Sequence, residues 1–292
     1  RVVAVRPVYS GPLPNSTRMQ VGIVAQRNNP RAAALADEIG SHLDDDGVTS
    51  VVDETTATRL DAAGVPVAEM DACDLVVSIG GDGTFLFAAR GAGTTPIMGV
   101  NLGEVGFLNA VSPAAAVETV DSVVAEIRET GAPRTREMDR VRARGDGWTI
   151  PPAINEVAVL GRQRGHGQGV DLEVSVDGAR YTAGPADGVL IATPTGSTAY
   201  NLSEDGPLVH PDVRGFVITE MAGQSEMPPL VVDVDSEISV TVREPEQAVV
   251  VGDGRTSETV STPMSVTLSR AADPVRIAGP PLDFFAGLGK LD

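Results

Sequence analysis

Apolar and polar positions follow two different periods in the two halves of this 292-residue chain. In the first half, apolar-rich runs occur at 21–25, 48–52, 75–79 and 97–100, and stretches with helical spacing separate them. Continuous apolar runs are typical of strands that are covered on both faces. This order of strands and helices predicts an α/β domain built on an open, mostly parallel sheet.

Two of the expected helices have clear start signals. Asn29 and Pro30 form an N-cap and first-turn pair before the helical pattern at 32–43. A second helix is expected over 112–131, a stretch that opens with Ser-Pro and ends with Gly.

The second half of the chain has a period of two. Apolar residues alternate with polar ones over 170–176, 238–242 and 264–268. Asp177 and Gly178 follow the first of these stretches as a hairpin-turn pair. We therefore predict that this half is mostly β.

The change of period suggests the domain boundaries. We expect an α/β domain at 19–136, a β domain at 137–275, and a tail at 276–292 that returns to the first domain. Residues 1–18 precede Met19, the first methionine, and contain several turn-forming residues, so we expect them to be an extension outside the fold.

Composition excludes several classes of protein. No apolar run is long enough to cross a bilayer and no secretory signal opens the sequence, so we expect a cytoplasmic protein. The net charge of −18 argues against a nucleic-acid binder and against a partner at an anionic membrane surface. Cys73 is the only cysteine, and we give it no chemical role.

The charge also suggests a source. Lys290 is the only lysine among 22 basic residues, acidic residues are in excess, and large aromatic residues are few. This composition is typical of proteins from organisms that keep molar salt inside the cell, and we expect activity and folding to require high KCl. The three histidines, His42, His166 and His210, are too scattered to suggest a zinc site.

The segment Gly-Gly-Asp-Gly-Thr at 80–84 carries the strongest chemical signal. It lies between the strand expected at 75–79 and a helix expected at 85–90. Glycines there let the backbone approach a phosphate, and the helix N-terminus attracts the anion. An ordinary glycine-rich turn is the alternative. Neither a P-loop nor a Gly-x-Gly-x-x-Gly motif occurs, so any nucleotide is held differently.

Two further segments are rich in polar groups. Thr-Pro-Thr-Gly-Ser-Thr-Ala-Tyr at 193–200 follows a strand that begins after Asp187, and its hydroxyls suit ribose and phosphate oxygens. Asn155 and Glu156 open another β-like run and suit a ribose diol or an amide. Solvated turns are the alternative for each segment taken alone.

Together these segments resemble the NAD kinases. The motifs at 80–84, 101–108, 155–156, 187–188 and 193–200 occur in the order and approximate spacing of that family. The first motif is shared with diacylglycerol kinases, sphingosine kinases and phosphofructokinases, whereas the stretch at 193–200 makes the match specific.

The resemblance implies a fold, a reaction and partners. The first domain would be Rossmann-like and phosphofructokinase-like, and the second a β-sandwich. The chain would transfer a phosphoryl group from ATP, carried with Mg²⁺ or another divalent cation, to the 2′-hydroxyl of the adenosine ribose of NAD. Polyphosphate remains open as a donor. A homodimer or homotetramer is implied, with NAD sites near subunit contacts.

The resemblance also assigns residues. Asp82 would be the general base, and Gly81, Gly83 and Thr84 would accommodate nucleotide phosphates. The NAD contacts implied in the second domain, with Phe107 packing beside them, are Asn155, Glu156, Asp187, Thr195, Thr198, Ala199, Tyr200 and Ser203.

Three positions depart from the family pattern. Arg255 replaces a glutamine after a late Asp-Gly, Pro185 replaces a basic residue, and Gly223-Gln224 replaces a Pro-His pair. They bear on how the second half of NAD is held and on whether NADH is accepted. Two alternative functions stay open: a related kinase acting on a lipid or sugar phosphate, and a nucleotide-binding regulator without catalysis.

Overall fold

The chain folds as two units in the computed structural model, which describes residues 19–103, 107–161, 169–223 and 227–289. One unit runs to Glu137 and takes up the chain again from Val275, and the other is Met138–Pro274. No helix of the described residues is both long enough and apolar enough to cross a membrane.

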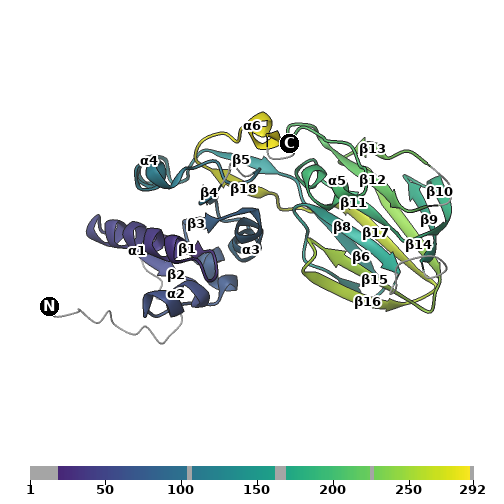
Figure 1. Ribbon diagram of the computed structural model, residues 1–292, viewed down its shortest axis with the longest axis horizontal. Helices are drawn as coiled ribbons and strands as arrows, with labels where there is room; N and C mark the ends of the chain where they lie inside the picture. Colours follow the sequence, from purple (N-terminus) through teal and green to yellow (C-terminus); the bar gives the residue numbers. More distant parts are fainter. Residues whose placement is uncertain (1–18, 104–106, 162–168, 224–226, 290–292) are drawn as a thin grey trace. The chain divides into compact units, whose positions relative to one another are not determined.

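The first unit is built on a six-stranded sheet (Figure 1). Its central strands pair in parallel, as the continuous apolar runs predict. The strand order is β2 (Thr49–Val52), β1 (Gln20–Ala25), β3 (Leu75–Gly80), β4 (Ile97–Asn101), β18 (Val275–Ala278) and β5 (Thr135–Met138).

Helices cover both faces of this sheet. The helices α1 (Pro30–Asp45) and α4 (Ala116–Thr130) pack with alternate residues of β1 and β3, including Val21, Ile23 and Val77, in one core. On the other face lies α3 (Asp82–Ala92) (Figure 1). It packs with the 3₁₀ helix η1 (Val67–Ala72). The shorter α2 (Glu54–Leu60) and η2 (Pro113–Ala115) also belong to this unit.

Helix starts follow the sequence signals, with one informative difference. The Asn29 side chain accepts hydrogen bonds from the N–H groups of Arg31 and Ala32 at 3.0 and 3.3 Å, which confirms the predicted cap of α1. Helix α3, however, begins at Asp82 rather than at Phe85. Because Gly81 is extended and takes the N-cap position, Asp82 lies in the first helical turn.

The second unit consists of two antiparallel sheets of six strands each. The first has the order β10 (Ala179–Ala186), β9 (Val170–Val176), β14 (Ile238–Glu244), β17 (Met264–Arg270), β6 (Val141–Gly145) and β7 (Trp148–Thr149). The second has the order β13 (Leu230–Asp233), β12 (Gly215–Met221), β11 (Gly188–Ala192), β8 (Glu156–Gly161), β15 (Gln247–Gly252) and β16 (Thr256–Ser261).

The two sheets share one apolar core. Leu172, Val174 and Val240 from the first sheet join Ile191 and Phe216 from the second in a single buried cluster. These residues sit on alternate positions of their strands, so the period of two is the signature of one buried face. The mostly-β prediction is confirmed as two packed antiparallel sheets.

The end of the chain belongs to the first unit. Strand β18 pairs in parallel with β4, with Ile277 opposite Ile97. The short helix α6 (Phe284–Leu288) follows, and the Phe284 ring centroid lies 6.0 Å from that of Phe107.

A glycine in α3 provides a test of the packing between that helix and η1. A Cβ added at Gly91 would lie 2.0 Å from the Val67 carbonyl oxygen, a backbone atom that cannot swing aside. We expect Gly91→Ala to lower the free energy of unfolding by about 3 kcal/mol, because overpacking shifts the backbone. Denaturant unfolding in molar KCl measures this change. Gly81→Ala is the control, since nothing lies within 4 Å of its added Cβ; equal stability of both variants would contradict the packing argument.

Candidate active site

The carboxylate of Asp82 is held by a segment that follows β4. It accepts hydrogen bonds from the backbone N–H groups of Phe107 and Leu108, each at 3.2 Å, and from Nδ2 of Asn109 at 3.1 Å. The position of Asp82 at the start of α3 fixes the other end of the side chain. A carboxylate anchored at both ends is a well-positioned proton acceptor.

Asn109 is a site residue that the sequence motifs do not reveal. Its side chain is 1% exposed, and its Oδ1 has no hydrogen-bond partner among the described residues. Gly99 makes room for it, because a Cβ there would lie 2.3 Å from that oxygen. The amide is therefore seated in the protein interior and directed at Asp82.

The glycines of the 80–84 motif have different neighbours. A Cβ at Gly80 would come within 2.5 Å of Oγ1 of Thr84 and 2.9 Å of Cβ of Gln26, so packing requires glycine there. A Cβ at Gly81 would meet nothing within 4 Å, so its outer side is open. The first N–H groups of a helix lack partners within the helix. The start of α3 thus offers both space and donors for an anion.

The turn that joins β1 to α1 contacts this loop, and it carries a positively charged residue, Arg27. The Gln26 N–H donates to the Ile79 carbonyl at 2.8 Å, which sets the residue after β1 beside the end of β3. Arg27 follows directly and is exposed. Sequence reasoning did not single it out, because an isolated arginine in a turn carries no motif.

In the second unit, residues of the 193–203 stretch divide into two sets. The first set is buried and holds the backbone. Thr193 Oγ1 donates to the Ile154 carbonyl at 2.6 Å, and Ser197 Oγ donates to the Val209 carbonyl at 3.2 Å. Asn201, fully buried, accepts from Thr219 Oγ1 at 2.7 Å. These three side chains thus hold the backbone of the fold through their hydrogen bonds.

The second set is at least partly accessible to solvent. Its members are the residues that the family resemblance assigns to the dinucleotide, namely Thr195, Thr198, Ala199, Tyr200 and Ser203. They belong to the 3₁₀ helix η3 (Thr195–Thr198) and the short helix α5 (Tyr200–Ser203), together with the residue between them. The buried set therefore builds a frame that presents the accessible set.

Asn155 and Glu156 lie against this segment. The Thr193 N–H donates to the Asn155 carbonyl at 2.8 Å, and a Cβ at Gly196 would lie 2.0 Å from the same oxygen. The Tyr200 N–H donates to the Glu156 carboxylate. The fold thus brings together two motifs that are about 40 residues apart in the sequence.

Glu156 has an unusual environment for a carboxyl group. Its residue is 6% exposed, and Oε2 has no hydrogen-bond partner among the described residues. Burial first, and then the charge of Asp253, raise the pKa of Glu156 to about 7, against the lowering effect of the Tyr200 N–H. Near neutral pH this group exchanges between a proton donor and an acceptor.

Asp187 is not part of this cluster. It immediately precedes β11, whereas the 193–200 segment follows that strand and Glu156 pairs with Ala192 at its far end. Five residues of strand span roughly 16 Å, so Asp187 is separated from Glu156 by the length of β11.

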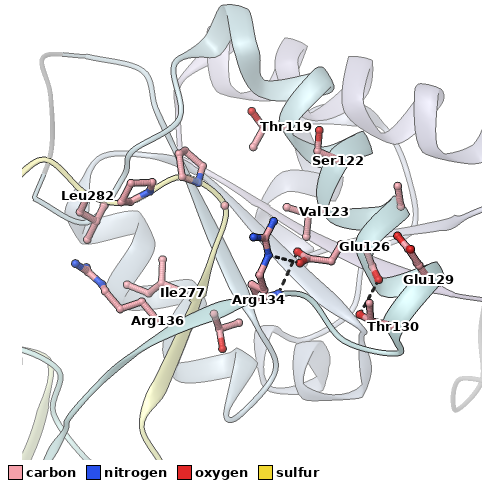
Figure 2. Close-up of a pocket in the computed structure, with 15 residues that line it drawn as sticks. Thr119, Ser122, Val123, Glu126, Glu129, Thr130, Arg134, Arg136, Ile277 and Leu282 are labelled. Carbon is pink, nitrogen blue, oxygen red and sulfur yellow. Dashed lines mark hydrogen bonds and ion pairs between the residues drawn. The ribbon is translucent and has the colours of Figure 1, made fainter.

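A groove of about 890 Å³ lies elsewhere in the first unit, along α4, β5 and the segment after β18 (Figure 2). Figure 2 shows Arg134 reaching across to Glu126, and its Nε donates to that carboxylate at 2.5 Å. None of the residues predicted for the site lines this groove. Volume alone therefore does not locate the chemistry of this protein.

Comparison with known proteins decides which family these features represent. The sequence profile of the ATP-NAD kinase N-terminal domain matches residues 21–127, and that of the ATP-NAD kinase C-terminal domain matches residues 154–278. The chain belongs to the NAD kinase family. An NAD kinase from Haloarcula marismortui is 60% identical in an alignment of 282 residues that covers 94% of this chain and 100% of that protein.

Solved structures agree with this family assignment. The structure of an NAD kinase from Archaeoglobus fulgidus in complex with ATP has a TM-score of 0.70 at 27% identity, covering 89% of this chain and 93% of that one. Yeast NADH kinase complexed with NADH shares the fold, with a TM-score of 0.79 at 21% identity, covering 95% and 88%. Relatives 56–60% identical come from halophilic archaea, in keeping with the acidic, lysine-poor composition.

The departures from the NAD kinase pattern lie at turns and edges where the structure describes them. Arg255 is exposed in the turn between β15 and β16, and Pro185 is exposed on β10. Gln224 and residues 104–106 of the 101–108 motif lie outside the described residues. Cys73 is buried, and burial raises the pKa of its thiol to about 12, in line with its having no chemical role.

The raised pKa of Glu156 makes stability depend on pH with a definite sign. The stability that Glu156 contributes is complete below pH 4.5, its ordinary pKa, and is lost as pH rises through about 7. Over this range, we expect the wild type to lose roughly 3 kcal/mol of unfolding free energy relative to Glu156→Gln. Denaturant unfolding at a series of pH values measures it. Glu244→Gln, at an exposed position, is the control; parallel curves for wild type and Glu156→Gln would refute the assignment.

Proposed function

We propose that this chain transfers the γ-phosphoryl group of ATP to the 2′-hydroxyl of the adenosine ribose of NAD, giving NADP and ADP. The observation that carries the proposal is the anchored carboxylate of Asp82 beside the open backbone of Gly81. Family membership supports NAD as the acceptor. The ATP complex of the Archaeoglobus fulgidus relative supports ATP as the donor.

Asp82 would act as the general base. Its carboxylate takes the proton of the ribose 2′-hydroxyl as that oxygen bonds to the γ-phosphorus, while the bond from phosphorus to the β,γ-bridging oxygen breaks and ADP leaves. A positioned base contributes about 10²–10⁴-fold to such a rate. The donors from Phe107, Leu108 and Asn109 keep the carboxylate in place for this step.

The phosphates of ATP would bind at the N-terminus of α3. Gly81, Gly83 and Thr84 supply backbone and hydroxyl donors there, and Arg27 supplies positive charge. Mg²⁺ is typically held by substrate phosphates and one or two carboxylates. Carried by the ATP phosphates, Mg²⁺ would neutralise charge on the transferring phosphoryl group.

NAD would bind on the frame built by the 193–200 segment. Asn155 and Glu156 suit the hydroxyls of a ribose, and Thr195 and Thr198 are the accessible hydroxyl residues around them. Tyr200 is partly exposed but its hydroxyl oxygen is buried, so its ring would be the part that contacts NAD. Ala199 and Ser203 extend the same surface, and Phe107, packed on the tail, would supply an apolar contact.

The base assignment can be tested with an isosteric change. Asp82→Asn keeps the size of the side chain and removes the proton acceptor, so we expect kcat to fall about 10²–10⁴-fold while KM for NAD changes little. NADP formation from NAD, Mg²⁺ and ATP, measured in molar KCl beside a polyphosphate arm, gives both values. Equal losses in kcat and in NAD binding would remove Asp82 as the base, and no NADP from folded wild type would remove the function.

The position of Asp187 supports a site completed by a second copy. We propose a homodimer or homotetramer in which Asp187, separated from Glu156 by the length of β11, contacts NAD bound to a neighbouring chain. One end of the dinucleotide would then contact the residues around Glu156, and the other end would contact Asp187 of another copy.

Mixed oligomers distinguish this arrangement from a site within one chain. Asp82→Asn and Asp187→Ala chains, each nearly inactive alone, are co-expressed with different tags and purified through both. If Asp187 contacts NAD bound to the neighbouring chain, a mixed dimer contains one intact site, which combines Asp82 of one chain with Asp187 of the other. NADP synthesis should then recover to about half the wild-type rate per pair of chains. No recovery in a mixed oligomer of verified composition would show that Asp187 acts within its own chain or not at all.

A further inference from the structure

The carboxylate of Asp253, in the turn between β15 and β16, binds three successive backbone N–H groups. It accepts from Ile154 at 3.0 Å, from Asn155 at 2.8 Å and from Glu156 at 3.4 Å. In return, the Asp253 N–H donates to the Glu156 carbonyl at 3.0 Å. These charge-assisted bonds tie the entrance of β8 to a residue about 100 positions further along the chain.

The same short segment is held from its other side by Thr193. The carbonyls of Ile154 and Asn155 accept from the side chain and the backbone of Thr193 at 2.6 and 2.8 Å. Asp253 therefore fixes the N–H groups of the segment and Thr193 fixes its carbonyls. With the backbone held on both sides, the directions of the Asn155 and Glu156 side chains are set by Asp253 as much as by their own strand.

The charges around Glu156 come from two elements besides its own. Asp253 is the negative group that faces it, and the Tyr200 N–H of α5 is the donor that its carboxylate accepts. Arg140, a residue that is 8% exposed, donates from Nε to the Asp273 carbonyl at 2.7 Å, and its charge interacts with those of Asp273 and Asp253. The charge of Asp253 thus interacts with a buried cation as well as with the acid of the candidate site.

We propose that Asp253 is a positioning residue of the acceptor site, which acts through its three amide hydrogen bonds and its charge to set the orientation and protonation of Glu156 for binding ribose hydroxyls of NAD. The proposal rests on the function proposed above and names how the acceptor half of that site is organised. Asp253 itself contacts no substrate in this account.

The competing explanation is that Asp253 only forms the turn between β15 and β16, because Asp-Gly pairs are common in hairpins. The chain contains a matched comparison. Asp177 and Gly178 form the turn between β9 and β10, with φ of 51° and 81°, and Asp253 and Gly254 have φ of 48° and 62°. Among the described residues, the Asp177 carboxylate accepts from the Glu237 N–H at 2.9 Å and from none of residues 154–156. A substitution at Asp177 therefore changes a similar turn without changing Glu156.

The test compares Asp253→Asn with Asp177→Asn in full-length protein in molar KCl. KM for NAD, KM for ATP, kcat and the pH profile of kcat/KM for NAD are measured for both and for the wild type. We expect Asp253→Asn to raise KM for NAD about tenfold and to leave KM for ATP within about twofold. Because the negative charge beside Glu156 is gone, the limb of the profile that Glu156 governs should move about one pH unit to lower pH. Asp177→Asn should match the wild type in all four measurements.

A wild-type KM for NAD and an unshifted pH profile in folded Asp253→Asn would overturn the proposal, while NADP formation by the wild type would leave the proposed function intact. Asp253→Ser, which keeps one short acceptor, replaces Asp253→Asn should the latter fail to fold. Loss of folding in both variants, with Asp177→Asn folded, would assign Asp253 to the fold alone and would equally overturn it.

Discussion

The hydrogen bonds between the Asp82 carboxylate and residues 107–109 join the two pieces of chain on which the phosphate site depends. One piece is the end of β3 with the start of α3, and the other is the segment that follows β4. In a parallel sheet both emerge at the carboxyl edge, where ligands bind in open α/β folds. Without these bonds the carboxylate would sample several rotamers, and the open backbone of Gly81 would face a mobile acid rather than a fixed one.

In the second unit, neutral side chains hold the candidate site in place. The side chains of Thr193, Ser197 and Asn201 form hydrogen bonds inside the protein. These bonds hold a turn-rich segment in one conformation. The accessible hydroxyls beside them are then presented without further ordering, which reduces the entropic cost of binding. Glu156 is the exception, since it is buried with an incompletely bonded carboxyl group. Such a group destabilises the fold at neutral pH, as is expected of a residue with the binding role proposed above.

Much of the fold could be predicted from the chain alone. The Asn29-Pro30 cap, the apolar runs and the Asp177-Gly178 hairpin are local signals, and each matches the structure. Strand β18 was not predicted, because four residues with little periodicity acquire their partner, β4, from across the whole sequence. Asn109 and the hydrogen bonds of Asp253 were not predicted for the same reason, since they span 27 and 97 to 99 residues. The local Asp-Gly pattern at 253–254 indicates a turn and nothing more.

The sequence motifs predicted which residues belong to the site, but not which of them lie close together within one chain. Asn155-Glu156 and the 193–200 segment meet as expected, whereas Asp187 lies beyond the length of β11. The proposed reaction therefore depends most on where the ribose of NAD lies relative to Asp82. A structure of the chain with NAD bound measures this directly. The account predicts the adenosine 2′-oxygen within about 2.6–3.2 Å of the Asp82 carboxylate, with the bonds to Phe107 and Leu108 retained. A bound NAD whose 2′-oxygen is out of hydrogen-bond reach of Asp82, directly or through one water, would contradict it.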